Sequence, residues 1–393
     1  MAAGLGGGRD VLGSPHRPMT LGILGGGQLG RMTALAALRL GLDVRILAER
    51  PSGPAAPFAG ATVADWTDPF VLRDWGEGCD AVTVESEWAP ADRLLDVLPA
   101  GVLLWPSPDT LRTVRHKGRQ RDRLAERGLP QPDYARAATR EALGAAADRF
   151  GLPVVAKRFE GSYDGYGNAT CRTPEELDDA WGRLAADDGL LVEAFVPFEA
   201  ELAVQVARRA DGEAVVYPAV RSEHRDHRLH AATVPAGLDA DLEAEARRVA
   251  LAAVEAVEAV GVVTVELFLL GAGAGRRVRV NEIAPRPHNT GHIWTEAGHT
   301  SQYENHVRAV LGWPLGSPDL RVPAACLVNV LGVREGTSRP RLHDALAVEG
   351  ASLHLYGKPD VRPARKMGHV VVTAPTPDAA RRRAERAATL VRL

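Results

Sequence analysis

The sequence predicts a multidomain protein of mixed α/β and α+β class, with a parallel-sheet domain first and antiparallel sheets after it. The chain has 393 residues, which at roughly 100–200 residues per domain allows two to four domains. The pattern of residues 21–24, 31–40 and 44–47 indicates strand, helix and strand, and such a β-α-β unit normally builds a parallel sheet. Residues 203–206 and 214–218 instead alternate as the strands of an antiparallel sheet do.

Changes of composition along the chain set the expected domain boundaries. Arginine-rich residues 109–127 end at a Gly-Leu-Pro stop, and glycine-rich tracts separate the later strands. The further expected elements are strands at 81–84, 101–104, 154–157, 190–193, 262–270 and 278–283, helices from 174 and over 242–260, and a basic loop over 354–369. The predicted parts are a disordered extension (1–18), an N-terminal α/β domain (19–112), a central part with a lid (113–202), a second α+β part (203–320) and a small C-terminal module (321–393).

Composition excludes several classes of protein. With 45% hydrophobic and 25% charged residues and a net charge of −3, the chain has neither the basic excess of a nucleic-acid protein nor the charge excess of a disordered one. No run approaches the roughly 20 apolar residues of a membrane span. The cysteines, Cys79, Cys171 and Cys326, form no CxxC pair, which argues against a disulfide framework or structural zinc. We therefore expect a cytoplasmic protein without nucleic-acid or membrane partners.

A glycine motif follows the first strand. Gly25, Gly27 and Gly30 have the spacing of the dinucleotide fingerprint, and Glu49 stands about 20 residues on, where that motif carries a ribose-binding acid. Glycines at a helix N-terminus let an anion approach backbone amides. The sequence alone leaves three alternatives open: a dinucleotide, another phosphorylated ligand, or a tight strand-to-helix turn.

Two carboxylates stand symmetrically about a predicted hairpin. Glu266 and Glu282 flank a glycine-rich tract centred on Ala274, so a hairpin there would place them opposite one another, roughly 5 Å apart. Facing like charges destabilise a sheet unless one protonates or a cation neutralises both. Mg²⁺ is commonly bound by one or two carboxylates, with water and phosphate oxygens as its other ligands. Solvent-facing acids, or acids paired with arginines, are the alternatives, and the polar run 286–292 favours a site.

A lysine and a second glycine loop suggest phosphate binding. Lys157 ends an apolar strand, and the glycine-rich loop 161–167 follows it; a strand lysine under such a loop commonly holds triphosphate oxygens. A surface hairpin with a snorkelling lysine is the alternative. Glu193 and Glu201 lie near another strand end, where either one accepts from ribose hydroxyls or is simply exposed.

Together these segments resemble the ATP-grasp superfamily and, within it, the N5-carboxyaminoimidazole ribonucleotide synthase family of purine biosynthesis. The resemblance extends from residue 21 to about 373. It is carried by residues 25–32, 83–87, Lys117 with Gln120 and Arg121, Lys157 with Arg158, 163–165, 281–286, 288–292 and 362–369. It implies the ATP-grasp fold, ATP and Mg²⁺ as cofactors, and ATP held between the lid and the carboxylate hairpin.

The resemblance also implies roles for individual residues. Those implied for the nucleotide are Lys117 and Lys157 at the phosphates, the closing loop of Ser162, Tyr163, Asp164, Gly165, Tyr166, Gly167 and Asn168, Glu193 and Val196 at adenine, Glu201 at ribose, His224, and Asn281 beside the Mg²⁺ ligands Glu266 and Glu282. Those implied for a phosphorylated aminoimidazole riboside are Gln28, Leu29, Glu85, Asn289, Lys358, Arg365 and Lys366. The implied catalytic residues are Tyr163, Asp164, Arg286 and Lys358.

The implied reaction joins bicarbonate to an amine through carboxyphosphate, in an enzyme expected to be a homodimer. Three departures from the family pattern leave the electrophile and the acceptor open. Ser162 and Tyr166 replace a glycine and a basic residue, residues 221–227 differ from the usual motif, and Ile293 is inserted before Trp294. Arg221 is a candidate to replace the missing cation. The alternative is a related ligase of specialised metabolism that activates a different carboxylate.

Overall fold

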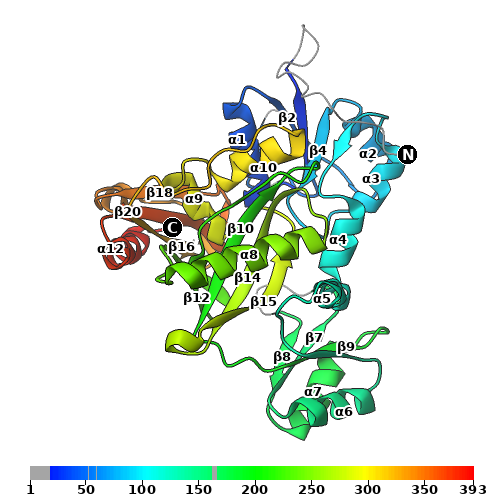
Figure 1. The fold of residues 1–393 in the computed structure, drawn as a ribbon. Helices are drawn as coiled ribbons and strands as arrows, with labels where there is room; N and C mark the ends of the chain where they lie inside the picture. Colours follow the sequence, from blue (N-terminus) through cyan, green and yellow to red (C-terminus); the bar gives the residue numbers. More distant parts are fainter. Residues whose placement is uncertain (1–17, 52, 59, 162–165) are drawn as a thin grey trace.

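The computed structural model describes residues 18–51, 53–58, 60–161 and 166–393 (Figure 1). The predictions for the extension before residue 18 and for Ser162, Tyr163, Asp164 and Gly165 lie outside these residues. The predicted class is confirmed: a parallel-sheet domain comes first and antiparallel sheets follow.

The N-terminal domain is a five-stranded sheet in the order β3-β2-β1-β4-β5, parallel throughout. Its central strand is buried on both faces, as parallel sheets covered by helices are. The strands are β1 (Thr20–Leu24), β2 (Asp43–Ala48), β3 (Ala61–Val63), β4 (Ala81–Val84) and β5 (Leu103–Leu104), and the helices are α1 (Gln28–Arg39), α2 (Pro69–Gly76) and α3 (Ala91–Val97). The strand expected over 101–104 is therefore shorter than predicted.

The lid is a four-stranded antiparallel sheet in the order β6-β9-β7-β8, with two helices packed on it at the bottom of Figure 1. Leu143 and Leu177 of the helices pack on Val154 and Val192 of the strands. Its elements are β6 (Tyr134–Ala137), α6 (Arg140–Phe150), β7 (Val154–Arg158), β8 (Asn168–Cys171), α7 (Pro174–Leu184) and β9 (Leu190–Ala194). Helices α4 (Pro108–Arg115) and α5 (Lys117–Glu126) lead into the lid from the N-terminal domain.

The largest sheet follows the order β15-β14-β10-β12-β13-β16-β20-β18, with β11 paired to β10. Helix α8 buries Val249 and Ala253 against Val204 and Val265 of this sheet. The elements before residue 312 are β10 (Ala200–Arg208), β11 (Ala214–Val216), β12 (Val220–Arg225), β13 (Arg228–Val234), α8 (Ala240–Ala256), β14 (Gly261–Leu270), η1 (Gly273–Gly275), β15 (Arg277–Ala284), η2 (Thr290–Ile293), α9 (Trp294–Ala297) and α10 (Gln302–Leu311).

The C-terminal segment extends the same sheet. Its elements are β16 (Ala324–Leu331), β17 (Gly336–Thr337), α11 (His343–Leu346), β18 (Ala351–Leu355), β19 (Asp360–Val361), β20 (Lys366–Ala374) and α12 (Pro377–Leu390). The prediction of one basic loop over 354–369 is wrong at both ends, because His354 and His369 are paired strand residues whose rings stack 4.6 Å apart. The basic residues of this segment suggested a loop, although its two ends belong to the strands β18 and β20.

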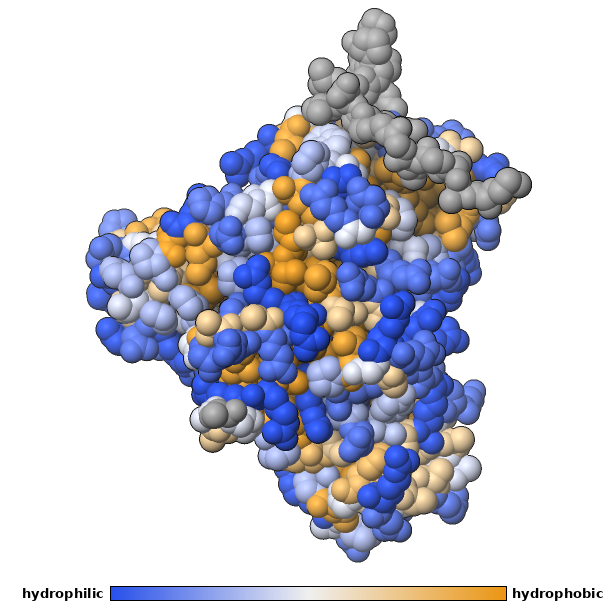
Figure 2. Space-filling view, viewed as in Figure 1, coloured by the Kyte–Doolittle hydropathy of each residue, from blue (hydrophilic) through white to orange (hydrophobic). Residues whose placement is uncertain are grey.

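Hydrophilic and hydrophobic residues are interspersed over the face drawn in Figure 2. In the described part of the chain, no helix is long and apolar enough to cross a membrane. The fold thus brings three units together around one region: the lid, the N-terminal domain and the carboxylate strands β14 and β15 (Figure 1).

Candidate active site

A cleft of about 1100 Å³ lies where the lid, the N-terminal domain and the large sheet meet. Most of the described candidate residues line it: Gln28, Leu29, Glu85, Lys117, Lys157, Asn168, Glu193, Val196, Glu201, His224, Glu266, Asn281, Glu282, Arg286, Asn289 and Lys366. Tyr166, Gly167, Lys358 and Arg365 are outside this lining. Residues far apart in the sequence therefore share one cavity.

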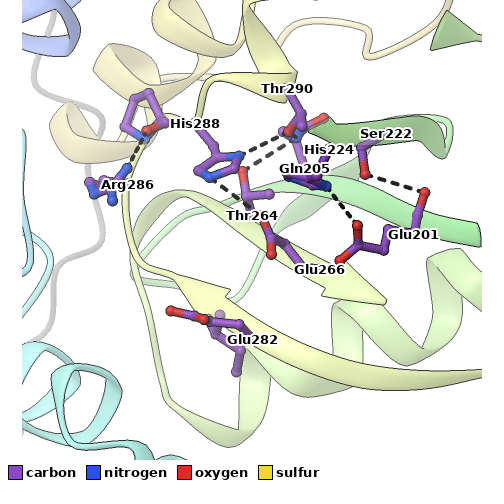
Figure 3. Close-up of polar contacts among 12 residues, drawn as sticks. Glu201, Gln205, Ser222, His224, Thr264, Glu266, Glu282, Arg286, His288 and Thr290 are labelled. Atoms are coloured by element: carbon purple, nitrogen blue, oxygen red, sulfur yellow. Dashed lines mark hydrogen bonds and ion pairs between the residues drawn. The ribbon is translucent and has the colours of Figure 1, made fainter. Parts of the chain in front are cut away.

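The two carboxylates occupy the predicted cross-strand positions. Glu266 of β14 pairs with Glu282 of β15, and a bulge follows Glu266. Figure 3 shows both side chains on neighbouring strands, with His288 Nε2 3.5 Å from the Glu266 carboxylate. Burial, and then the charge of Glu282, raises the pKa of Glu266 to about 7. The predicted pairing of Glu266 with Glu282 is confirmed, although the register between this pair and the turn is shifted by one residue. The facing charges carry the expected energetic cost.

Among the described residues, no group of three or more His, Cys, Asp or Glu side chains could hold a metal ion. The donor set is two carboxylates, with the Asn281 amide lining the same cleft. That set is too small to enclose a cation, but it suits Mg²⁺, which keeps waters and takes substrate phosphate oxygens as further ligands. The residues therefore fit a magnesium–phosphate site.

Both lysines are paired with acids. Lys117 Nζ, at the start of α5, lies 2.9 Å from Glu282 Oε2, and Lys157 Nζ lies 2.6 Å from Glu193 Oε2. Burial lowers the pKa of Lys157, while Glu193 raises it. The Glu193 side chain is only 4% exposed; burial favours its neutral form, but Arg121 and Lys157 lower its pKa to about 2. Its carboxylate therefore serves as a counter-ion.

A histidine and a carboxylate meet on β10 and β12. His224 Nδ1 is 2.6 Å from Glu201 Oε2, and Ser222 donates to the Glu201 backbone oxygen (Figure 3). Burial lowers the pKa of His224, but the hydrogen bond and charge of Glu201 outweigh burial and raise it. Phe198 and Phe268 stack 4.8 Å apart nearby in the cleft lining, which gives this end an aromatic wall beside a polar pair.

The glycine motif holds a carboxylate of the protein itself. The amides of Gly27 and Gly30 donate to Glu85 Oε1 and Oε2 over 2.8 and 2.6 Å. A Cβ on Gly25 would meet Glu85 Cγ at 2.1 Å, and one on Gly27 would meet Oε1 at 2.3 Å. Burial raises the pKa of Glu85, and the two amides oppose that shift. Among the three alternatives the structure disfavours the dinucleotide, because Glu85 occupies the amides that a dinucleotide phosphate would need.

The rest of this end of the cleft combines an ion pair with the buried amide of Asn289. Arg286 Nε lies 2.6 Å from Glu87 Oε2, and Arg286 lowers the pKa of Glu87 against the opposing effect of burial. Both amide atoms of Asn289 are buried, and neither has a hydrogen-bond partner among the described residues. Lys358 Nζ donates to the Lys366 carbonyl over 2.7 Å. Asn289 itself lines the cleft.

Some residues of the lining were not foreseen. Glu87 lies in a quoted motif but received no role, and Arg381 of helix α12 had no signal in its Ala/Arg-rich segment. Arg221, considered as a replacement cation, lies 3.3 Å from Glu199, which also binds Arg276. Arg221 is therefore partly neutralised by this acid. The roles implied for individual residues remain predictions.

One cleft brings together a lid, a pair of carboxylates and two lysines. This arrangement is typical of nucleotide-dependent ligases of the ATP-grasp class. Comparison with known families agrees: the ATP-grasp domain matches residues 122–303, the ribonucleotide synthetase preATP-grasp domain residues 18–115, and the phosphoribosylaminoimidazole carboxylase C-terminal domain residues 325–383. The N5-carboxyaminoimidazole ribonucleotide synthase of Synechococcus elongatus is 36% identical over 90% of this chain and 89% of its own. The chain belongs to the N5-carboxyaminoimidazole ribonucleotide synthase family of ATP-grasp ligases.

Solved structures and a longer relative give the same family. The N5-carboxyaminoimidazole ribonucleotide synthetase of Thermus thermophilus has a TM-score of 0.84 and 37% identity, covering 94% of this chain and 98% of that one. The synthase of Aspergillus clavatus, solved with ADP and 5-aminoimidazole ribonucleotide, has a TM-score of 0.83 and 31% identity over 94% and 97% of the two chains. The Schizosaccharomyces pombe phosphoribosylaminoimidazole carboxylase is 37% identical over 92% of this chain, which spans 66% of that longer protein.

Proposed function

We propose that this protein uses ATP to carboxylate the amine of 5-aminoimidazole ribonucleotide with bicarbonate, giving N5-carboxyaminoimidazole ribonucleotide, ADP and phosphate. The observation that carries the proposal is the shared cleft: Glu266 and Glu282 line the same cavity as Glu85 and Asn289. A phosphoryl donor and an amine acceptor would thus meet in one space. Membership of the synthase family supports the same substrates.

The nucleotide half is assigned to the lid and the carboxylate strands. Lys117 and Lys157 would bind phosphate oxygens, and the aromatic wall of Phe198 and Phe268 lies beside His224 and Glu201, which suits the nucleoside. Glu266 and Glu282, with Asn281 beside them, would hold Mg²⁺. When bound, Mg²⁺ neutralises charge on the transferring phosphoryl group.

Bicarbonate activation sets the demands on the protein. Bicarbonate is a poor electrophile, and its phosphorylation to carboxyphosphate creates a leaving group. Lys117 and Lys157 would stabilise charge in the transition state as preorganised cations, and Arg286, fixed by Glu87 at 2.6 Å, would hold the carboxyphosphate anion. The lid would exclude water, which otherwise hydrolyses the intermediate. The amine then attacks the carboxyphosphate carbon, or CO₂ released from it, and phosphate leaves.

The acceptor half is assigned to the N-terminal domain and the C-terminal loop. Gln28, Glu85 and Asn289 line the cleft there, and Lys358 with Lys366 would bind the phosphate of the ribonucleotide. Burial lowers the pKa of Lys358 to about 8, helped by the charges of Arg365 and Lys366. We also expect a cytoplasmic homodimer. The comparisons do not favour the alternative of a different carboxylate.

The test measures phosphate release with ATP and Mg²⁺. Bicarbonate should support release, and 5-aminoimidazole ribonucleotide should stimulate it further; no stimulation by the ribonucleotide contradicts the proposed acceptor. Release driven by another carboxylic acid but not by bicarbonate contradicts the proposed electrophile. Glu282→Gln should abolish turnover, whereas Glu126→Gln, an exposed acid on α5, should leave it unchanged.

A further inference from the structure

Arg121 is buried where helix α5, the lid strand β9 and the strand β15 meet. Its side chain is 3% exposed. Nε lies 2.7 Å from Glu193 Oε1 on the lid strand β9, while the two terminal nitrogens donate to the carbonyls of Val280, at 3.1 Å, and Asn281, at 2.7 Å, on β15. A single guanidinium on α5 thus joins the lid to the strand that carries Glu282.

The other oxygen of the same carboxylate binds Lys157. Glu193 Oε2 lies 2.6 Å from Lys157 Nζ. The Lys157 side chain is 10% exposed and that of Glu193 4%, so both ions are nearly enclosed. A continuous path of polar contacts therefore runs from the backbone beside Glu282, through Arg121 and Glu193, to the amine of Lys157.

Gln120 holds the same strand from the neighbouring position of α5. Its side-chain oxygen accepts from the Ile283 amide at 3.2 Å, and its side-chain nitrogen donates to the Val114 carbonyl at 3.1 Å. Helix α5 therefore contacts β15 on both sides of Glu282 in the sequence, through residues 280, 281 and 283. The start of the helix adds Lys117, paired with Glu282 itself.

We propose that Arg121 is a positioning residue that fixes the lid lysine Lys157 relative to the carboxylate Glu282, so that one triphosphate can be gripped from both sides. Arg121 itself binds protein atoms and does not touch the nucleotide. The inference rests on the proposed nucleotide site and adds to it the part that sets its geometry.

The chemistry of the contacts requires arginine. Three nitrogens of the planar fork donate to four oxygens in different directions, those of Glu193, Val280 and Asn281 and the side-chain oxygen of Gln131. Lysine has a single ammonium on a flexible stem. Arg121→Lys should keep a positive charge beside Glu193 but lose the grip on the Val280 and Asn281 carbonyls. Arg121→Gln should lose both. The two variants therefore separate charge from geometry.

The test compares Arg121→Lys, Arg121→Gln and the control Arg123→Gln. Arg123 lies on the same helix, is 53% exposed and pairs only with Glu126 at 3.3 Å among the described residues, so its variant should behave as the wild type. Misplacing reacting groups by about 1 Å can cost about 100-fold in rate. Both Arg121 variants should lose about 10- to 100-fold in kcat of bicarbonate-dependent ATP cleavage, beyond any rise in KM for ATP.

A pH profile separates positioning from general loss of stability. In the wild type Arg121 and Lys157 hold the pKa of Glu193 at about 2, so kcat/KM for ATP should show no acid limb from this group between pH 5 and 7. In Arg121→Gln only Lys157 remains of the two cations that lower the pKa of Glu193, so burial should raise that pKa and an acid limb should appear at higher pH than in the wild type. Arg121→Lys should remove the limb while its kcat stays low.

The outcomes decide the inference. The same kcat and pH profile in wild type and both Arg121 variants would overturn it, as would a loss of kcat in Arg121→Gln that Arg121→Lys restores fully. A double variant with Glu193→Gln should be little worse than Arg121→Gln, because the two residues act as one unit; additive losses would overturn the path through Glu193. Thermal denaturation of each variant shows whether it is folded, and a wild type that binds no ADP would instead overturn the proposed function.

Discussion

Neutralising Glu266 should stabilise the metal-free protein while removing magnesium-dependent turnover. Burial and Glu282 raise the pKa of Glu266 from 4.5 to about 7. Since each unit corresponds to 1.36 kcal/mol, an ionised Glu266 destabilises the folded state by about 3 kcal/mol at most. The side chain is 23% exposed, so solvent screening reduces this cost, and we expect Glu266→Gln to gain about 2 kcal/mol at pH 8.

The sign of the pH dependence follows from linkage. Between pH 4.5 and about 7 the unfolded chain has released the Glu266 proton while the folded chain retains it. The wild type therefore loses stability as pH rises through this window, and Glu266→Gln does not. The difference between the two proteins isolates this group from the titration of all others.

The assay is urea unfolding in EDTA at pH 4.5 and pH 8, with phosphate release measured separately. Glu266→Gln and wild type should differ little at pH 4.5, and the variant should be the more stable at pH 8. Addition of Mg²⁺ with ADP should raise the stability of the wild type and leave the variant unchanged. Glu126→Gln, at an exposed position, serves as the control. A variant less stable than wild type at pH 8, or a difference independent of pH, would refute the reasoning.

Three further predictions concern separate parts of the molecule. Gly27→Ala would place a Cβ 2.3 Å from Glu85 Oε1, so thermal denaturation should show that the protein loses about 1.5–3 kcal/mol of stability through its carboxylate contacts. The control Gly182→Ala has nothing within 4 Å of its Cβ and should not destabilise the protein. Equal stabilities of the two variants would argue against the tight fit around Glu85. Burial lowers the pKa of His306 to about 3, so below about pH 6 the unfolded chain binds a proton at this histidine and the folded chain does not. The free energy of unfolding should therefore fall by about 1.4 kcal/mol for each pH unit of acidification. His306→Gln should reduce this slope in acid unfolding. Because burial lowers the pKa of Lys358 to about 8, affinity for the ribonucleotide, measured by calorimetry, should weaken as pH rises through that value, and an unchanged pH dependence in Lys358→Met would contradict the assignment.

The hairpin shows what the sequence can predict. Side chains of a strand alternate, and a short connection fixes which residues face one another. A hairpin centred on Ala274 predicts the pairing of Glu266 with Glu282, which is observed, but the strands next to the turn pair one residue out of that register, as Leu270 with Arg277. The bulge after Glu266 changes the register only on the turn side of the pair. Local rules therefore give the pairing to within one residue, and the bulge decides which residue faces Glu266.

The pairing of Glu193 depends on tertiary structure. The sequence shows an acid at the end of an apolar strand, which is compatible with ribose binding or exposure. Its two cations come from α5 and from β7, and no periodicity in the sequence relates these elements. Only the folded structure shows that the Glu193 carboxylate is paired with Arg121 and Lys157.

The ligand of the glycine motif likewise could not be predicted from the local sequence. A helix N-terminus with flanking glycines attracts any anion, because its amides carry unsatisfied donors and a partial positive charge. A phosphate and a carboxylate meet that requirement equally well. The chain supplies Glu85 directly after β4, 55 residues after Gly30, and a local motif cannot show that such a distant acid contacts it. The family resemblance placed Glu85 near the acceptor, but not on these amides.

The cleft contains few free charges in the described residues, because Lys117 pairs with Glu282, Lys157 with Glu193 and Arg286 with Glu87. Pairing lowers the cost of burying these charges. The pairs differ in how easily they can exchange partners: the Glu193 side chain is 4% exposed and is held by two cations, whereas that of Glu282 is 40% exposed and faces Glu266. Lys117 can therefore exchange a carboxylate for a phosphate at less cost than Lys157. Lys157 is therefore the more firmly held of the two amines, and Lys117 is the one that can change its partner at less cost.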